Sequence, residues 1–149
     1  MSLTWTIKPF GDLNATELYA ILQLRNAVFV VEQDCPYQDA DGKDQASWHL
    51  SAYEGAQLVA YARIIPPGIS YAEASIGRVV TAPSARGTGI GRELMEHSMR
   101  YCSELFGTAS IRIGAQLYLE KFYASLGFIS SGESYLDDGI PHIEMLTGK

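Results

Sequence analysis

The hydrophobic pattern of this chain changes period several times, which predicts short strands interleaved with helices. Strand-like runs of apolar residues occur at 3–8, 48–53, 57–65, 75–81, 110–113, 128–131 and 142–146. Helical spacing occupies three stretches, at residues 14–30, 90–106 and 116–127. The chain has no repeat, low-complexity segment or linker, so we expect one domain over residues 1–149.

A few polar residues mark where these elements begin and end. Asn14 followed by Glu17 predicts a capping-box start for the first helix, and Gly127 is suited to end the last one. Residues 34–47 are polar and contain four aspartates, which predicts a solvated loop with room for a short helix. This loop lacks the glutamate-terminated spacing of an EF-hand, so we expect no calcium site.

The composition is that of an ordinary globular protein, because 47% of the residues are hydrophobic and 19% are charged. The net charge of −6 argues against a nucleic-acid partner, since such binding rewards clustered Lys and Arg. An acidic protein suits the encounter with a cationic or amine substrate.

Nothing in the chain predicts contact with a membrane. No run is apolar enough to span one, and the first five residues lack the basic start and apolar centre of a signal peptide. Both absences favour the cytoplasm. Cys102 lies on the apolar stripe of the second helix, whereas the role of Cys35, next to Pro36, stays open. Neither cysteine has metal-ligand spacing, and a reducing compartment disfavours a disulfide.

The stretch from Val79 to Met95 combines a strand, a glycine turn and an amphipathic helix. Glycines allow a close approach to the backbone, and the start of a helix attracts anions, so a pyrophosphate is the natural ligand. A P-loop is excluded because Arg92 and Glu93 follow the last glycine, and the spacing G-x-G-x-G excludes a dinucleotide fingerprint. There remains R-x-x-G-x-G, from Arg86 to Gly91, or else an ordinary glycine-rich turn.

A second motif near the C-terminus contains Gln116, Tyr123, Gly127 and Phe128 with the spacing Q-x6-Y-x3-G-F. The two motifs together resemble the coenzyme A site of the GNAT superfamily of N-acetyltransferases, which usually has asparagine where Gln116 stands. The resemblance implies an α/β (α+β) fold with a mixed, mostly antiparallel central sheet of about six to seven strands and about four flanking helices. That sheet is splayed between its two central strands.

Further segments resemble one branch of the superfamily, the ElaA type, at residues 24–33, 35–37, 39–44, 76–80 and 138–143. The resemblance therefore covers the whole chain, and it specifies a family better than a substrate. It implies acetyl-CoA as the co-substrate, no metal, and a small-molecule amine or a protein amino group as the acceptor. It also implies direct transfer without a covalent enzyme intermediate, and a homodimer, which is common in the superfamily.

The resemblance extends to the roles of particular residues. Backbone groups of Val79, Val80 and Thr81 would hold the pantetheine arm as an added strand, and an N–H near Val80 would stabilise the oxyanion. Tyr123 would protonate the leaving thiolate, with a tyrosine packed in the core as the alternative. The other residues implied in coenzyme A binding are Arg86, Gly87, Thr88, Gly89, Ile90, Gly91, Arg92 and Gln116.

The acceptor amine must lose a proton before it attacks. A lysine-like amine has a pKa of about 10.4, so holding it neutral at pH 7 costs roughly 4.6 kcal/mol. Many GNAT enzymes carry a glutamate eight residues before the proline of the loop, but Ser75 stands there in this chain. The alternative bases are Glu32, His49, Glu73 and His142, and we rank Glu32 and His49 first.

Arg78 and His142 are expected on the acceptor side of the site. Arg78 lies within an apolar strand, where a buried guanidinium needs a partner. Two explanations stand equal: an ion pair with Glu32 or an aspartate of residues 34–44, or a fork for an acceptor carboxylate. His142 either faces the acceptor or is a structural histidine.

Two other functions stay open. Ser75 at the usual glutamate position favours a non-catalytic acetyl-CoA-binding module, whereas Tyr123 and the intact glycine loop disfavour it. An acyltransferase with another acyl donor is the second alternative, because residues 24–29 faintly resemble acyl-homoserine-lactone synthases.

Overall fold

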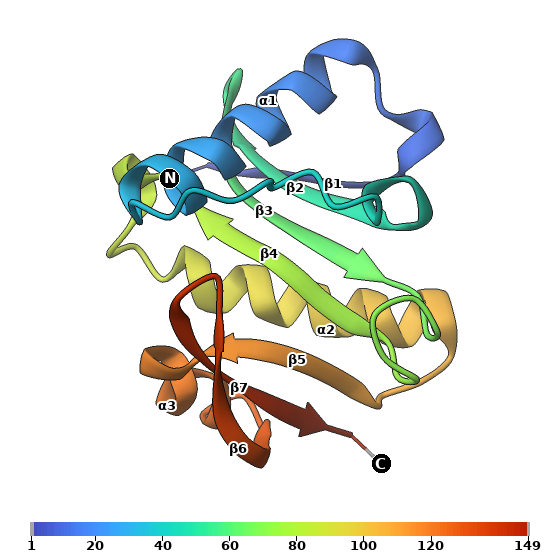
Figure 1. The fold of residues 1–149 in the computed structure, drawn as a ribbon. Coiled ribbons are helices and arrows are strands. Elements are labelled where there is room, and N and C mark those ends of the chain that lie inside the picture. The colour runs from blue at the N-terminus through green and yellow to red at the C-terminus, as the bar shows by residue number, and fades with distance from the viewer. Residues whose placement is uncertain (1, 149) are drawn as a thin grey trace.

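The computed structural model describes residues 2–148, in which seven strands form two antiparallel sheets (Figure 1). The first sheet has the order β1-β2-β3-β4, made of Thr4–Pro9, Trp48–Glu54, Gln57–Ile65 and Ser75–Thr81. The second sheet has the order β5-β7-β6, in which β5 is Ile111–Gln116, β6 is Ile129–Asp137 and β7 is Ile140–Thr147. The element order and the mostly antiparallel pairing confirm the fold class predicted above.

Three α-helices accompany these sheets within the described residues, namely α1 Ala15–Arg25, α2 Ile90–Phe106 and α3 Glu120–Ala124. The predicted capping box is present, because Glu17 N donates to Asn14 Oδ1 at 2.8 Å and Asn14 N donates to Glu17 Oε1 at 2.9 Å. A π-helical segment, Asn26–Glu32, continues α1, and such segments are frequent at functional sites. The same part of the chain has no helix long and apolar enough to cross a membrane.

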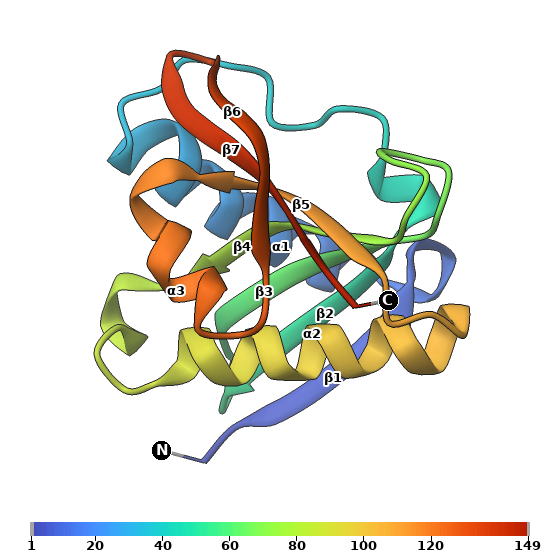
Figure 2. The same ribbon diagram turned by 90° about the horizontal axis from the view of Figure 1, so that it is seen from below.

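The helices α1 and α2 cover opposite faces of the first sheet (Figures 1 and 2). Strand β3 is buried on both faces, and its side chains alternate between two cores. Ala62 and Ile64 pack in the cluster that contains Leu94 of α2, whereas Tyr61 packs with Ile21 of α1. Full burial of one such aliphatic side chain is worth about 1.5–3 kcal/mol, so the sheet is held firmly between its helices.

Strands β4 and β5 lie side by side at one end only. A parallel bridge pairs Ala74 with Ile111, and Arg112 N donates to the Ala74 carbonyl at 2.9 Å. Within residues 2–148 no longer β4–β5 ladder follows, and the two strands diverge toward their C-terminal ends (Figure 1). The predicted splay between two central strands is therefore present.

A bulge interrupts β4 within its splayed half. Tyr61 pairs with Val80 and Arg63 pairs with Gly77, so Arg78 and Val79 together oppose Ala62. Arg78 has a left-handed φ of +49°, which is uncommon for a residue with a Cβ. Because a bulge leaves a residue out of the ladder, its backbone polar groups become available to other partners.

Three predicted features near the C-terminal end need correction. Strand β5 continues to Gln116, so this residue ends a strand and does not begin a helix. A 3-10 turn, Leu117–Leu119, precedes the short α3. Residues 2–148 contain three α-helices, where about four were implied. Strand β6 runs on to Asp137, past the predicted end at residue 131. It is an exposed edge strand with a bulge, so it lacks the apolar alternation that predicts strands.

Candidate active site

A cleft with a volume of about 480 Å³ lies between β4 and β5 where the two strands diverge. Its other walls come from the π-helical segment, the glycine loop, α3 and the β6–β7 hairpin. Ten of the predicted site residues line it: Glu32, Arg78, Val79, Val80, Thr81, Arg86, Gly91, Gln116, Tyr123 and His142. Five more lie beside it in the glycine loop and the first turn of α2: Gly87, Thr88, Gly89, Ile90 and Arg92.

The glycine loop is built so that its backbone faces open space. Gly87 and Gly89 have φ values of +81° and +82°, a conformation that residues with a side chain rarely adopt. Gly89 caps α2, and the first bond that closes the helix runs from Glu93 N to Gly89 O at 3.2 Å. The N–H groups of Ile90 and Gly91 precede that bond and have no partner within the helix. No atom lies within 4 Å of where a Cβ would stand on any of the three loop glycines, so a ligand has room there.

Two arginines flank these open N–H groups. Arg86 makes a two-pronged ion pair with Glu32, with N–O distances of 2.6 and 2.9 Å, on the exposed side of the cleft. Arg92 donates to Ser125 Oγ at 2.5 Å and lies over the Phe122 ring. The hydrogen bond from Arg86 holds the pKa of Glu32 below its usual value. A carboxylate with a lowered pKa is a weak proton acceptor, which argues against Glu32 as the general base.

Tyr123 lies on the second wall of the cleft and is 93% buried, since only 7% of its surface is exposed. The rings of Phe122 and Phe128 contact it edge-on, with centroids 5.2 and 6.0 Å away. Burial raises the pKa of Tyr123 to about 12, so its hydroxyl keeps its proton at neutral pH. Gln116, at the end of β5, contacts Gln33 through its side-chain amide at 3.4 Å. Tyr123 is thus packed in the core and also lines the cleft. Packing in the core and a position beside the ligand are therefore compatible for this residue.

Arg78, at the bulge, has its partners in the acidic loop and not in Glu32. Its Nε lies 2.9 Å from Asp39 Oδ1, and its Nη2 donates to the Asp39 carbonyl at 3.1 Å. Its guanidinium also lies over the Tyr37 ring, 5.5 Å from the centroid. Of the two explanations for Arg78, the structure contains the ion pair.

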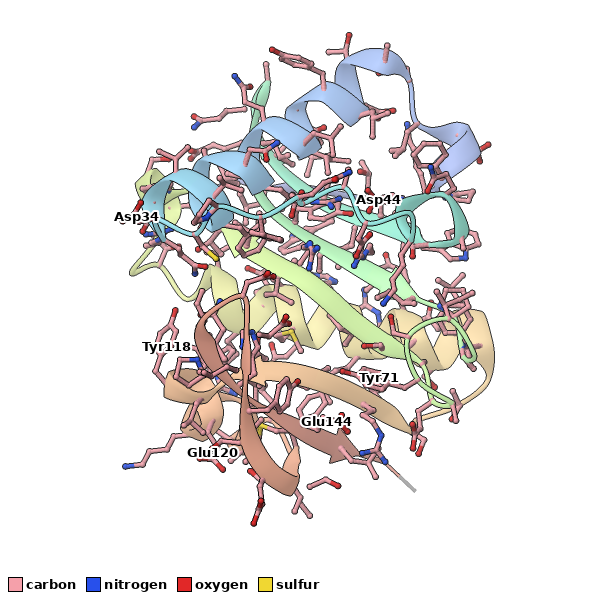
Figure 3. All side chains as sticks on the ribbon, in the orientation of Figure 1. Asp34, Asp44, Tyr71, Tyr118, Glu120 and Glu144 are labelled. Carbon is pink, nitrogen blue, oxygen red and sulfur yellow. The ribbon has the colours of Figure 1, made fainter. Side chains whose placement is uncertain are left out.

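The prediction that residues 34–47 form a loop with a short helix is confirmed, because a 3-10 helix, Asp44–Ala46, lies near its end. The prediction that the loop is solvated is wrong for Asp39 and Asp44, which are buried. The loop runs from Asp34 to Asp44 along the first sheet (Figure 3) and is tied down by buried charges. Arg25, which is fully buried, contacts Asp39 Oδ2 at 2.7 Å and Asp44 Oδ1 at 2.8 Å. Arg63 pairs with Asp44 at 2.9 Å and with both oxygens of Asp41 at 2.7 and 2.8 Å. Three arginines and three aspartates therefore form one network.

Two of the four predicted bases lie outside the cleft. His49 is buried, and both ring nitrogens are engaged, Nδ1 with the Tyr61 hydroxyl at 2.6 Å and Nε2 with the Asp44 carbonyl at 2.9 Å. Burial lowers the pKa of His49, which keeps the ring neutral. Glu73 makes a two-pronged ion pair with Arg112 at 3.0 and 3.1 Å. His49 and Glu73 therefore have structural partners, and neither side chain lines the cleft.

His142 also lines the cleft, and within residues 2–148 only its Nδ1 has a hydrogen-bond partner. Its Nδ1 lies 2.7 Å from the Ile140 carbonyl, and its ring stacks on Tyr135 with centroids 5.9 Å apart. Nearby, Cys35 Sγ donates to the Asp138 carbonyl at 3.2 Å and so links the acidic loop to the β6–β7 turn. Residues 2–148 hold no group of three His, Cys, Asp or Glu side chains arranged as metal ligands.

Comparison with known proteins identifies the family. Residues 16–147 match the family model described as an acetyltransferase (GNAT) domain. The chain belongs to the GNAT acetyltransferase family. Protein ElaA of Escherichia coli K12 is 42% identical over 145 residues, which cover 96% of this chain and 95% of ElaA. The resemblance to the ElaA branch, drawn above from short segments, is confirmed.

Solved structures agree with this assignment. The crystal structure of E. coli ElaA matches with a TM-score of 0.92 and 40% identity, over 98% of this chain and 99% of that one. An acyl-CoA N-acyltransferase from Pseudomonas aeruginosa matches with a TM-score of 0.94 and 44% identity, over 99% of this chain and 100% of that one. As a member of the GNAT family, the protein is an acyltransferase.

The GNAT cleft also contains residues that the sequence analysis does not single out for the site. Tyr37, Asp137 and Asp138 line it together with Ile140. One signal could have located three of them, because Asp138-Gly139 is a two-residue turn of the kind that joins hairpin strands, with φ values of +51° and +79°. Tyr37 has no comparable signal, since only the ion pairs of the acidic loop bring it to Arg78.

Proposed function

We propose that this GNAT protein transfers an acetyl group from acetyl-CoA to an amine, by direct attack of the amine on the thioester. The observation that carries this proposal is the cleft between β4 and β5. A bulged strand, an open helix N-terminus and a buried tyrosine all line or adjoin this one space. The acceptor is a small-molecule amine or a protein amino group.

The glycine loop would hold the pyrophosphate of the donor. Backbone N–H groups at a helix start carry partial positive charge, and Gly87 and Gly89 leave room for phosphate oxygens against the backbone. Arg86 and Arg92 add positive charge at the same place. Because the chain carries a net charge of −6, this local attraction must overcome a general repulsion of the anionic donor.

The bulge in β4 would serve the thioester. The pantetheine arm would run along Val79, Val80 and Thr81 and take main-chain hydrogen bonds, as an added strand does. A backbone N–H at Arg78–Val79 or Val80 would then donate to the carbonyl oxygen as it becomes an oxyanion. Loss of one such donor in other enzymes lowers the rate by about 10²–10³. The bulge would therefore have to hold this N–H group in a fixed position.

Tyr123 would protonate the thiolate of coenzyme A as it leaves. The position of Tyr123 supports this role, because its side chain lines the cleft and its hydroxyl carries a proton at neutral pH. Arg78 would act indirectly, since its Nε and Nη2 contacts with Asp39 support the bulge.

Calorimetric titration with acetyl-CoA tests the donor site. We expect micromolar binding by the wild type and its loss in Gly89→Asp and in Arg86→Ala. Gly55→Asp is the matched control, because Gly55 also has a positive φ and open space but lies in the β2–β3 turn. Arg100→Ala is the control for the loss of an exposed arginine. Absence of binding by the wild type would overturn the proposal.

A screen of amines and peptides by mass spectrometry then tests transfer. We expect an N-acetylated product and a lower kcat in Tyr123→Phe, with little change in acetyl-CoA affinity. Slow hydrolysis of acetyl-CoA without any acceptor, unaffected by Tyr123→Phe, would instead indicate a non-catalytic acetyl-CoA-binding module. Turnover of a different acyl thioester in place of acetyl-CoA would correct the donor.

A further inference from the structure

His142 lies on the cleft face of the second sheet. It pairs with Gln116 of β5 and with Tyr135 of β6, at the end of β5 where the strands have diverged. Its neighbour Ile143 is buried in the core on the opposite face, so the alternation of β7 directs the His142 ring to the cleft. The ring is half-buried, which leaves it accessible to a ligand in the cleft.

The hydrogen bond of His142 fixes which nitrogen carries its proton. Nδ1 lies 2.7 Å from the carbonyl oxygen of Ile140, and a carbonyl oxygen can only accept. Nδ1 therefore donates, and in the neutral ring Nε2 holds the lone pair. Across residues 2–148 the structure gives Nε2 no hydrogen-bond partner, so that lone pair is available to a ligand.

The ring is also held in place by an aromatic stack. Tyr135 lies against it with an interplanar angle of 26°. Tyr135 can lie there because Gly114 has no side chain: a Cβ at that position would stand 3.0 Å from the Tyr135 hydroxyl and 3.2 Å from that of Tyr71. The hydroxyls of Tyr71 and Tyr135 therefore lie beside the same position of β5. The orientation of His142 is thus determined by two neighbouring strands.

We propose that Nε2 of His142 is the general base that deprotonates the acceptor amine, an inference that rests on the acetyl transfer proposed above. R–NH3⁺ gives one proton to Nε2, and the neutral amine forms the C–N bond while the carbonyl electron pair moves to oxygen. The oxyanion then collapses and the C–S bond breaks. The thiolate takes the Tyr123 proton, and the new N–H2⁺ group returns a proton to that phenolate through water. The imidazolium releases its proton to solvent, so one proton leaves overall.

The side chains of the other candidate bases are held by partners within the protein, whereas Nε2 of His142 is not, within residues 2–148. Glu32 lies in the cleft but is held by Arg86, and His49 and Glu73 are engaged elsewhere. Charged and titratable groups also lie on the elements around His142. They are Tyr135 and Asp137 of β6, Asp138 of the turn, Glu144 of β7, Arg78 of β4 and Tyr71.

The test compares His142→Gln with the wild type, using an amine that the wild type acetylates. We expect kcat to fall by about 10²–10⁴, the usual worth of a general base, while the acetyl-CoA affinity measured by calorimetry is retained. The pH profile of the rate should differ between the two enzymes, because the wild type has an imidazole that can accept the amine proton and the variant has none. The residual rate of the variant should keep rising toward the pKa of the amine.

Two further variants separate a chemical role from a structural one. Added imidazole should partly restore the rate of His142→Ala, which a merely structural histidine would not allow. His97→Gln is the matched control, because His97 lies on α2 away from the cleft, stacked on Trp5. A His142→Gln enzyme with kcat and pH profile within about threefold of the wild type would overturn the assignment. No acetyl-CoA binding or transfer by the wild type itself would overturn the proposed function, and this assignment with it.

Discussion

The acidic loop, residues 34–47, and the glycine loop, residues 82–91, both lie beside β4 and carry charged groups, but the charges have different roles. Three aspartates of the acidic loop form ion pairs with Arg25 of α1, Arg63 of β3 and Arg78 of β4. Arg25 is fully buried. In the glycine loop, Arg86 and the adjoining Arg92 are exposed, and the first backbone N–H groups of α2 have no partner within the helix.

This difference separates charges that build the site from charges that bind the ligand. Buried ion pairs recover their desolvation cost only when every partner is present, and they then have little capacity left for a ligand. Exposed arginines and open N–H groups have the reverse properties, since they contribute little to folding and much to anion binding. The acidic loop therefore supports the bulge through Arg78, and the glycine loop is left to meet the donor.

The largest expected effect of this contrast is on stability. Asp39→Asn removes the carboxylate that Arg25 and Arg78 share, and leaves buried positive charge with weaker partners. We expect the free energy of unfolding to fall by about 3–5 kcal/mol, measured by urea denaturation. Asp34→Asn is the matched control, because Asp34 is exposed in the same loop and the described residues give it no ion pair. Equal, small effects in both variants would contradict the role given to the network.

The second prediction concerns the pH dependence of that stability. Hydrogen bonds and charges from Arg63 and Arg25 hold the pKa values of Asp41 and Asp44 below the usual range, and burial lowers the pKa of His49. Since each pKa is lower in the folded state, unfolding takes up protons on acidification. The His49 contribution is complete above about pH 6.5 and declines below it, and the aspartate contribution declines below about pH 4.

Thermal unfolding between pH 8 and 3 checks this expectation. The melting temperature should decline gently below about pH 6.5 and steeply below about pH 4. His49→Gln should remove the gentle part of the slope and keep the steep part. A melting temperature that is constant down to pH 3 would show that these groups do not titrate on unfolding as described.

The two loops also differ in how far they could be predicted from the sequence. The R-x-x-G-x-G loop is contiguous, and its function depends on local backbone geometry, so its residues are found by inspection. The acidic network joins Arg25 to Asp39 and Asp44, and Arg63 to Asp41, across 14 to 22 positions. Only the fold brings these residues together. From the sequence alone, the polar segment 34–47 therefore cannot be distinguished from a loop whose aspartates are all in solvent.

The same reasoning explains the ranking of the candidate bases. His49 and His142 both lie in strands, and a strand pattern alone does not say which face meets the ligand. His49 pairs with Arg63 of β3 and is buried with its ring nitrogens on the Tyr61 hydroxyl and the Asp44 carbonyl. Pairing with Gln116 instead brings His142 to the cleft. Tyr123 and Gln116 could be located because both belong to the motif that resembles the GNAT family. The motif did not show that Gln116 ends a strand.

The third prediction returns to the glycine loop and has a smaller effect on stability. Gly91 lies in the first turn of α2, has no positive φ, and has nothing within 4 Å of a Cβ. Gly91→Ala should therefore leave the fold intact or stabilise it by up to about 1 kcal/mol, because alanine favours a helix. Its acetyl-CoA affinity should nonetheless fall, since a methyl group would stand where phosphate meets the backbone. Unchanged affinity, measured by calorimetry, would mean that the donor does not approach Gly91.

The smallest expected effect comes from Glu32, the carboxylate that pairs with Arg86 at the rim of the cleft. Glu32→Gln keeps the shape of the side chain but releases the full charge of Arg86 for an anionic ligand. Because the pair is exposed, we expect little change in melting temperature and an acetyl-CoA affinity about two- to fivefold higher at low salt. Added salt should diminish this gain, whereas the loss in Gly91→Ala should persist, because a steric clash is not screened. If Glu32→Gln instead slowed turnover by about two orders of magnitude or more, Glu32 would regain the role of base and His142 would lose it.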